Sequence, residues 1–320
     1  MKIAFLDVAT VGEVPNKDEI KKLGEYVEYP VTAPEQRIER LADVDVAIVN
    51  KVVIDRDVMS ACPNLKLICV AATGTNNIDL ACATEKHILV RNVAGYSTDS
   101  VAQVTFALIL ELITRTHYYN EYIFSGKYSS SNLFTHFGTP FRELSGKQFG
   151  IIGLGAIGKR VATVAEAFGA HVSYYSASGN RQNVPYPCLG LEDLLRNADI
   201  VSVHAPLNDR TENLIGSRQL ALMKPTALLV NVGRGGIVDE TALAEALDTD
   251  VIAGAGLDVY AREPLSANHP LLSVRKKEKL LLLPHIAWAS VEARTTLIHR
   301  IAENIKDFIS EGVDYRNDNR

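Results

Sequence analysis

Three stretches in the second half of the chain carry residue types suited to acid–base chemistry on a small carboxylic acid. Arg234 lies in NVGRGGIVDE, Glu263 in GLDVYAREP and His285 in LLLLPHIAWAS. An arginine can bind a carboxylate through two parallel hydrogen bonds, and a histidine can deliver a proton to a carbonyl oxygen near neutral pH. A carboxylate beside the histidine would stabilise its protonated form. Taken singly, each residue could instead serve a turn or face solvent, but together they fit the reduction of a 2-keto acid.

A glycine motif upstream predicts a dinucleotide site. Gly153, Gly155 and Gly158 have G-x-G-x-x-G spacing between an expected strand and an expected helix. The first glycine permits a tight turn, the second lets the backbone approach a pyrophosphate, and the third allows close helix–strand packing. The phosphates would bind the amides at the helix N-terminus. A plain tight turn between strand and helix is the alternative interpretation.

The adenosine end of this expected site lacks the usual acid. About twenty residues after the motif, where a carboxylate commonly binds the ribose 2′-hydroxyl, the sequence has Tyr175 and then Ser176. Without a carboxylate a 2′-phosphate is not repelled, and Ser176, Ser178 and Arg181 could bind it. We therefore predict NAD or NADP as the cofactor and favour relaxed or NADP-tolerant use. The alternative is a flexible loop that still binds NAD, less selectively.

Short apolar runs alternate with helical patterns along the chain, which predicts parallel sheets built from βαβ units. The expected strands are residues 2–8, 44–50, 65–72, 88–94, 149–153, 171–175, 199–205, 227–233, 251–259 and 280–286. The three polar stretches follow expected strands, and open α/β sheets bind ligands at the carboxyl ends of their strands. We predict an α/β fold with two Rossmann-like doubly wound parallel-sheet domains and a cleft between them.

Two long helical patterns mark the expected domain boundaries. Residues 98–117 are mostly apolar, and residues 290–312 have amphipathic spacing. The second helix could pack back on the N-terminal sheet. We therefore predict a discontinuous substrate-binding domain of residues 1–97 and 288–320, and a dinucleotide-binding domain of residues 98–287.

The composition argues against several other classes of protein. With 320 residues, 47% of them apolar and 22% charged, the chain suits a soluble protein of two domains. The net charge of -5 disfavours a nucleic-acid binder, and RKKEK at 275–279 is expected to be a solvated loop. The four cysteines lack zinc-site spacing, so no metal is predicted. Neither a signal-peptide pattern nor a membrane-length apolar run is present, which predicts no membrane association and a cytoplasmic location.

These motifs together resemble the D-2-hydroxyacid dehydrogenase family over nearly the whole chain. The matching stretches are GLGAIG, VSVHAPL, NVGRGGIVDE, GLDVY-x-x-EP and PHIAWAS. The resemblance implies that Arg234 binds the substrate carboxylate, that His285 is the acid/base and that Glu263 pairs with His285. It also implies that a second set of residues lines the cofactor, with Asp258 on the nicotinamide side. This set comprises Ala156, Ile157, His204, Ala205, Pro206, Val232, Gly233, Arg234, Asp258 and His285.

Within the family, VAATGTNNIDL, NVAGYSTDSVAQ and PHIAWAS are most similar to glycerate dehydrogenases, also called hydroxypyruvate reductases. In such enzymes the first stretch forms the substrate loop, so amides near Thr73, Gly74 and Thr75 would bind the carboxylate. An ordinary strand-to-helix turn is the alternative. The resemblance predicts reduction of hydroxypyruvate to D-glycerate, with glyoxylate as a second substrate that gives glycolate.

Other functions stay open at this point. A D-lactate-type 2-keto acid reductase is the nearest alternative, because the three catalytic residues do not distinguish substrate side chains. A phosphoglycerate dehydrogenase is disfavoured by the chain length, and formate chemistry by the Glu–His pair. An NAD-sensing corepressor-like binding protein is disfavoured by the lack of a long disordered arm.

The resemblance also implies a homodimer formed through the cofactor domain. The aromatic stretch at residues 125–147 could serve that contact. A simple connecting loop is the alternative interpretation of this stretch.

Overall fold

The computed structural model describes residues 1–311, so the last residues of the first predicted domain, 312–320, lie outside the described part of the chain. The chain divides into two compact units, one of Met1–Ser97 with the chain from Ala289 onward, the other of Thr98–Trp288. Each unit contains one wholly parallel sheet. The predicted fold class, two parallel-sheet α/β domains, is confirmed.

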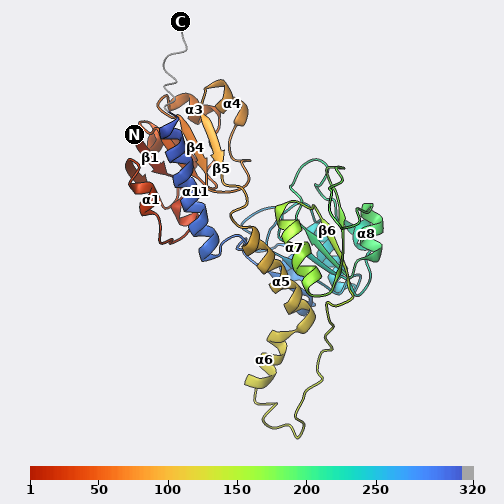
Figure 1. Cartoon of the computed structure of the whole chain (residues 1–320). Helices are drawn as coiled ribbons and strands as arrows, with labels where there is room; N and C mark the ends of the chain where they lie inside the picture. The colour runs from red at the N-terminus through yellow and green to blue at the C-terminus, as the bar shows by residue number, and fades with distance from the viewer. Residues whose placement is uncertain (312–320) are drawn as a thin grey trace. The chain divides into compact units, whose positions relative to one another are not determined.

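The first unit is built on a sheet with the strand order β2-β1-β3-β4-β5. Helix α11, from the far end of the sequence, packs against α1 and β4 (Figure 1). The strands are β1 Lys2–Phe5, β2 Glu25–Glu28, β3 Val46–Val49, β4 Leu67–Val70 and β5 Leu89–Asn92. The helices are α1 Asp18–Lys21, α2 Arg37–Leu41, α3 Arg56–Ala61, α4 Leu80–Glu85 and α11 Val291–Ser310, with 3-10 turns η1 Val8–Thr10 and η2 Pro34–Gln36.

The second unit is built on a sheet with the order β11-β10-β9-β8-β6-β7. The strands are β6 Gln148–Ile152, β7 His171–Tyr175, β8 Ile200–Val203, β9 Leu228–Asn231, β10 Gly254–Leu257 and β11 Leu280–Leu282. The helices are α5 Thr98–Thr114, α6 Thr116–Phe124, α7 Ala156–Ala167, α8 Leu191–Asn197, α9 Ser217–Leu220 and α10 Glu240–Asp248, with 3-10 turns η3 Pro270–Ser273 and η4 Lys277–Lys279.

Helices cover both faces of the second sheet, which is why its central strands are apolar without alternation. Consecutive residues of β6 enter different apolar clusters: Ile152 packs with Leu194 of α8 and Leu243 of α10. Its neighbour Ile151 packs with Val161 of α7 on the other face. In both units the strand order reverses beside the first strand, between β1 and β3 and between β6 and β8. Ligands bind at the carboxyl ends of strands at such switch points.

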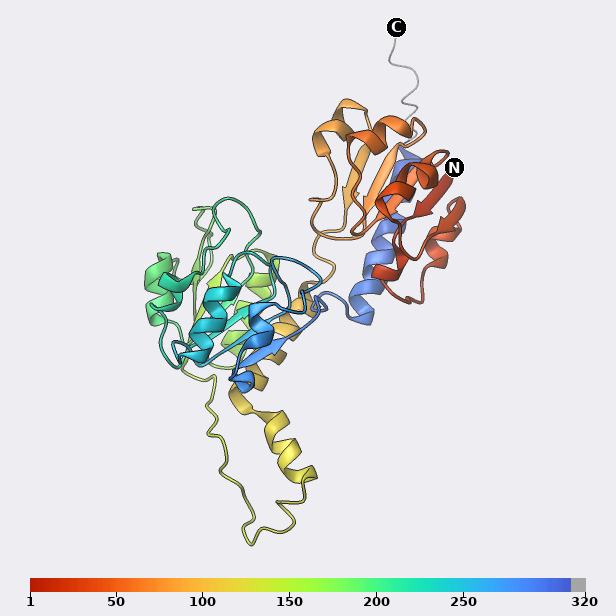
Figure 2. The ribbon, with the colours of Figure 1, turned by 180° about the vertical axis from the view of Figure 1, so that it is seen from behind.

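Two local features differ from the sequence expectation. Strand β2, with the sequence EYVE, was not expected, because it is a half-exposed edge strand without an apolar run. The single helix expected over 98–117 is broken at Arg115, which has a left-handed backbone with φ of 54° between α5 and α6. Figures 1 and 2 show α6 and the chain that follows it standing away from the sheet of their own unit.

No helix within residues 1–311 combines the length and the apolar character needed to cross a bilayer.

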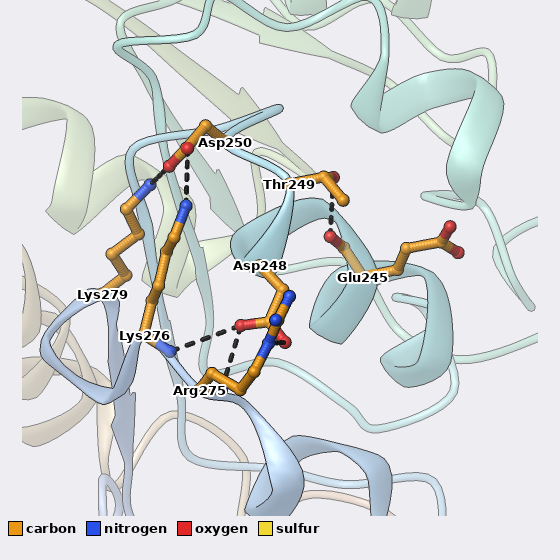
Figure 3. Close-up of polar contacts among 7 residues, drawn as sticks. All are labelled: Glu245, Asp248, Thr249, Asp250, Arg275, Lys276 and Lys279. Carbon is orange, nitrogen blue, oxygen red and sulfur yellow. Dashed lines mark hydrogen bonds and ion pairs between the residues drawn. The ribbon is translucent and has the colours of Figure 1, made fainter.

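The basic cluster at 275–279 is largely exposed, as expected from the sequence, and ion pairs also hold it to the end of α10 (Figure 3). Arg275 Nε bonds Asp248 Oδ2 at 3.1 Å. Lys276 and Lys279 both bond the carboxylate of Asp250, and the Lys279 side chain is only 17% exposed. These cations offset two carboxylates at the negative end of the helix dipole.

We expect Asp250→Asn to lower the melting temperature at pH 7 but not near pH 2. Hydrogen bonds from Lys276 and Lys279 hold the pKa of Asp250 at about 2, below the value of about 4 for an unfolded chain. The folded state thus gains stability above pH 4 that it loses as the pH falls from about 4 to about 2. Asparagine tolerates the left-handed backbone at this position, where φ is 62°.

Thermal unfolding of the wild type and the variant from pH 2 to pH 7 checks this. The exposed Glu212 supplies a control, Glu212→Gln, that should change the melting temperature little at any pH. A constant difference between wild type and Asp250→Asn across this range would contradict the expectation.

Candidate active site

The three glycines of the dinucleotide motif form a cradle between β6 and α7. Gly153 has φ of 92°, and a Cβ on it would lie 2.7 Å from the backbone of Ala205. A Cβ on Gly158 would overlap the carbonyl oxygen of Gly153, whereas one on Gly155 would meet nothing within 4 Å. Helix α7 begins at Ala156 without a side-chain cap, so its first amides are available to a phosphate. The cradle fits the pyrophosphate of a dinucleotide.

The end of β8 lies between the glycine cradle and the turn after β9. A Cβ on Gly233 would come within 3.1 Å of Val203 O and 3.3 Å of Ala205 O. The His204 ring contacts Ser202 Oγ at 2.8 Å through Nε2, and burial lowers its pKa to about 3, so this ring is neutral at physiological pH. The loops after β6, β8 and β9, which carry many of the expected cofactor residues, therefore meet at one edge of the sheet.

The loop after β7 folds over the glycine cradle. Tyr175 O accepts Gly153 N at 3.0 Å, and Ser176 Oγ bonds Asn180 O at 2.8 Å. Gln182, which the sequence did not indicate, donates its amide to Leu154 O within the cradle at 2.6 Å. The loop at 176–182 contains no acid.

A cation unforeseen from the sequence contacts this loop. Arg210, in the turn after β8, donates to Ser178 O at 3.1 Å. Arg181 is exposed at the far end of the same loop. The structure thus brings Arg210 to the loop that carries Ser176 and Ser178, where a 2′-phosphate could be bound.

His285 and Glu263 lie in contact at the ends of β11 and β10. His285 Nδ1 and Glu263 Oε2 are 2.6 Å apart, and the two side chains are 26% and 32% exposed. His285 has a left-handed backbone with φ of 56°. Because Nδ1 is engaged with the carboxylate, Nε2 is the ring atom that can exchange a proton with a substrate.

Asp258 anchors the turn that carries His285. Its carboxylate is 1% exposed and accepts Ile286 N at 2.7 Å and Ala287 N at 2.8 Å. Burial raises the pKa of Asp258, and the two amides oppose that rise. The predicted contact of Asp258 with the nicotinamide stays a prediction, and its observed bonds fix the backbone next to His285.

Arg234 extends from a turn held by Asn231, a residue that the sequence did not single out. Asn231 Nδ2 donates to Arg234 O at 2.9 Å, and its Oδ1 accepts Gly233 N at 3.1 Å. The Arg234 side chain is exposed. A Cβ on Gly235 would overlap the carbonyl group of Tyr260, so the turn of Arg234 is in direct backbone contact with the turn that leads to Glu263.

In the first unit, the loop after β4 holds Thr73, Gly74 and Thr75. Asn92 Nδ2 bonds Thr73 O at 2.5 Å, and Thr73 Oγ1 bonds Val93 O at 3.3 Å. The loop is thus tied to the end of β5. The prediction that its amides bind a carboxylate stays a prediction.

Within residues 1–311 there is no group of three His, Cys, Asp or Glu side chains placed to hold a metal ion.

Comparison with known proteins agrees with this geometry. A model of the NAD-binding domain of D-isomer specific 2-hydroxyacid dehydrogenases matches residues 106–287. The chain belongs to the D-isomer specific 2-hydroxyacid dehydrogenase family. It is therefore an NAD(P)-dependent oxidoreductase, and the family resemblance noted in its sequence is confirmed.

Three relatives illustrate the range of this family. The glycerate dehydrogenase of Methylorubrum extorquens is 37% identical over 313 residues, which cover 97% of this chain and 96% of the relative. A second relative is an NADPH-dependent glyoxylate/hydroxypyruvate reductase from Sinorhizobium meliloti, whose structure contains NADP and malonate. It matches with a TM-score of 0.80 and 27% identity, and the match covers 97% of this chain and 94% of the reductase chain. The third is a D-lactate dehydrogenase from Aquifex aeolicus, whose structure contains NAD and lactic acid. It also has a TM-score of 0.80 and 27% identity, and the match covers 97% of this chain and 96% of the lactate dehydrogenase chain.

We expect His285→Asn to lower kcat by about 10²- to 10⁴-fold, the usual contribution of a general acid. Asparagine tolerates the left-handed backbone of this position, so the turn should keep its shape and the dinucleotide its affinity. Steady-state kinetics give kcat, and quenching of protein fluorescence gives the Kd of the reduced dinucleotide. Wild-type turnover in this variant would remove the proton-transfer role from His285.

Proposed function

We propose that this 2-hydroxyacid dehydrogenase reduces hydroxypyruvate to D-glycerate and accepts glyoxylate as a second substrate. The observation that carries the chemistry is the 2.6 Å contact between His285 Nδ1 and Glu263 Oε2, next to the end of β10. The preference for hydroxypyruvate rests on the likeness to glycerate dehydrogenase and on the motifs at 70–80 and 92–103.

The reaction adds a hydride to substrate C2 and a proton to its carbonyl oxygen. A bound nicotinamide dinucleotide supplies the hydride. His285 donates the proton from Nε2, while Glu263 stabilises the protonated ring and keeps Nδ1 occupied. The Arg234 guanidinium binds the substrate carboxylate with two parallel hydrogen bonds, which turns the keto carbon toward the cofactor side of the site.

The cofactor-binding role belongs, in this proposal, to the carboxyl ends of β6 to β9. The glycine cradle and the first turn of α7, with Ala156 and Ile157, hold the pyrophosphate. The backbone after β8 and β9 lines the rest of the dinucleotide through His204, Ala205, Pro206, Val232 and Gly233.

NADP-tolerant use follows from the loop after β7. Tyr175 replaces the acid that would repel a 2′-phosphate. Ser176, Ser178 and Arg181 can bind that phosphate, and Arg210, bonded to Ser178 O, adds a second guanidinium. The cytoplasmic location and the substrate-binding amides at 73–75 also stay predictions.

A homodimer formed through the second unit is supported by the aromatic arm, residues 116–143. Phe134 and Phe137 of the arm are 90% and 91% exposed. His136 stacks on Tyr122 of α6 with ring centroids 3.7 Å apart, which gives the arm an ordered apolar surface. Large exposed apolar surfaces of this kind mark contacts between proteins, and a second copy of the chain offers the matching surface.

We expect the wild type to be a dimer by light scattering after size-exclusion chromatography. The double variant Phe134→Asp, Phe137→Asp should shift it to monomer with an unchanged circular dichroism spectrum, because charges at the centre of an apolar interface oppose association. Ile38→Asp, at an exposed apolar residue of α2 in the other unit, is the matched control and should stay dimeric. A monomeric wild type would contradict the dimer.

We expect kcat/KM for hydroxypyruvate to exceed that for pyruvate by about tenfold or more, because a site that bonds a substrate hydroxyl rejects an analogue without it. Arg234→Lys should raise KM for hydroxypyruvate, glyoxylate and pyruvate by similar factors, since all three share the carboxylate. Steady-state assays of the three keto acids check both points. A preference for pyruvate would indicate a D-lactate-type reductase instead.

The same assay with NADH and NADPH tests the cofactor preference. NADPH should serve at least as well as NADH, and Arg210→Ala should lower kcat/KM for NADPH more than for NADH. A strong NADH preference that Arg210→Ala leaves unchanged would contradict the assignment of this loop to a 2′-phosphate.

A further inference from the structure

A second histidine–carboxylate pair lies in the same unit as the catalytic pair. His269 Nε2 contacts Glu240 Oε2 at 2.9 Å, and the two side chains are only 13% and 9% exposed. Leu271 N donates to His269 Nδ1 at 3.4 Å. Because Nδ1 accepts that bond, Nε2 of the neutral ring carries the proton and donates it to Glu240. The proposed reaction assigns neither residue a task.

The other carboxylate oxygen of Glu240 reaches the turn that leads to Glu263. Glu240 Oε1 accepts Ala261 N at 2.7 Å. In the same turn Tyr260 N donates to Glu263 Oε1 at 2.9 Å, and Glu263 Oε2 contacts the catalytic His285. Two successive amides of one turn are therefore held by two glutamates, one of which contacts the ring that transfers the proton.

The peptide between Tyr260 and Ala261 also bounds the turn of Arg234. A Cβ on Gly235 would overlap the Tyr260 carbonyl and lie 2.5 Å from Ala261 N. Tyr260 is 8% exposed, and its hydroxyl donates to Leu283 O at 2.8 Å, two residues before His285. Movement of this one peptide would therefore disturb the backbone contacts and hydrogen bonds that hold Arg234, Glu263 and His285 in place.

The Glu240–His269 pair connects this peptide to two fixed elements. Glu240 is the first residue of α10, whose N-terminus is capped by the Asp239 side chain. His269 caps the 3-10 turn η3 and accepts Leu271 N there. Packing of α10 against η3 therefore sets the position of the Glu240 carboxylate, and that carboxylate sets the position of Ala261 N.

We propose that Glu240 and His269 are positioning residues of the active site. They hold the Tyr260–Ala261 peptide so that Glu263 bonds His285 in the orientation that proton transfer requires. His269 fixes one carboxylate oxygen of Glu240 and leaves the other to Ala261 N. The proposal rests on the proposed role of His285 as proton donor.

Glu240→Ala should lower kcat with hydroxypyruvate by about tenfold to hundredfold, because a catalytic group displaced by about 1 Å loses this much. The KM of the dinucleotide should stay within about twofold, since the glycine cradle is untouched. The pH midpoint of kcat/KM should move in the same direction as in Glu263→Gln. Added to Glu263→Gln, Glu240→Ala should move the midpoint little further, because both act through one contact.

Two milder variants keep the test informative if Glu240→Ala folds poorly. Glu240→Gln retains an oxygen for Ala261 N and should recover most of the lost rate. His269→Asn should shift the pH midpoint in the same direction as Glu240→Ala, and by less.

Leu247→Ala separates positioning from simple stabilisation. Leu247 is fully buried in α10, so its truncation should lower the melting temperature without moving the pH midpoint. The proposal is overturned if the melting temperature of Glu240→Ala falls as that of Leu247→Ala does while its kcat and the pH midpoint of kcat/KM stay at the wild-type values. If Glu263→Gln and His285→Asn themselves keep wild-type turnover, the proposed proton transfer fails instead.

Discussion

The active site depends on carboxylate and amide side chains that bind backbone N–H groups at the carboxyl edge of the second sheet. Asp258 binds two amides of the turn with His285, and Glu263 and Glu240 bind successive amides of the turn after β10. Asn231 binds the turn that carries Arg234 through both the nitrogen and the oxygen of its side-chain amide. Hydrogen bonds to charged groups contribute about 1.5–3 kcal/mol each, so these contacts can set the positions of loops that have little core of their own.

The first unit uses the same device at the carboxyl edge of its own sheet, although after a different strand. Asp7 follows β1, is 2% exposed, and accepts the amides of Asn50, Lys51 and Val52 after β3. Both units thus place a buried acid where parallel strands end and loops begin. A buried carboxylate is costly unless amides or cations compensate it, and the loop amides, which lack strand partners, provide that compensation. Loops at topologically different strand ends therefore use the same electrostatic solution.

Much of the fold follows from the sequence, because strands covered on both faces must be apolar throughout. Ten strands were expected from such runs, and the edge strand β2 was not, since one side of it needs no apolar residues. The sequence also gives no indication that the long helix breaks at Arg115, because a left-handed backbone is expected at glycine and not at arginine. Motif spacing indicated His285, Glu263 and Arg234. It could not indicate Glu240, whose partners lie 21 and 29 residues away and are set by how α10 packs.

Three histidines of the second unit show why His285 is the one proposed for proton transfer. The ring of His204 is buried beside Ser202, and its pKa of about 3 keeps it neutral at any physiological pH. His269 directs its proton to Glu240 and its other nitrogen to a backbone amide, so neither nitrogen is open to a substrate. His285 has one nitrogen on a carboxylate and a side chain that is 26% exposed. These three rings thus differ in what occupies their nitrogens, and among them His285 is the one that pairs with a carboxylate while its side chain stays partly exposed.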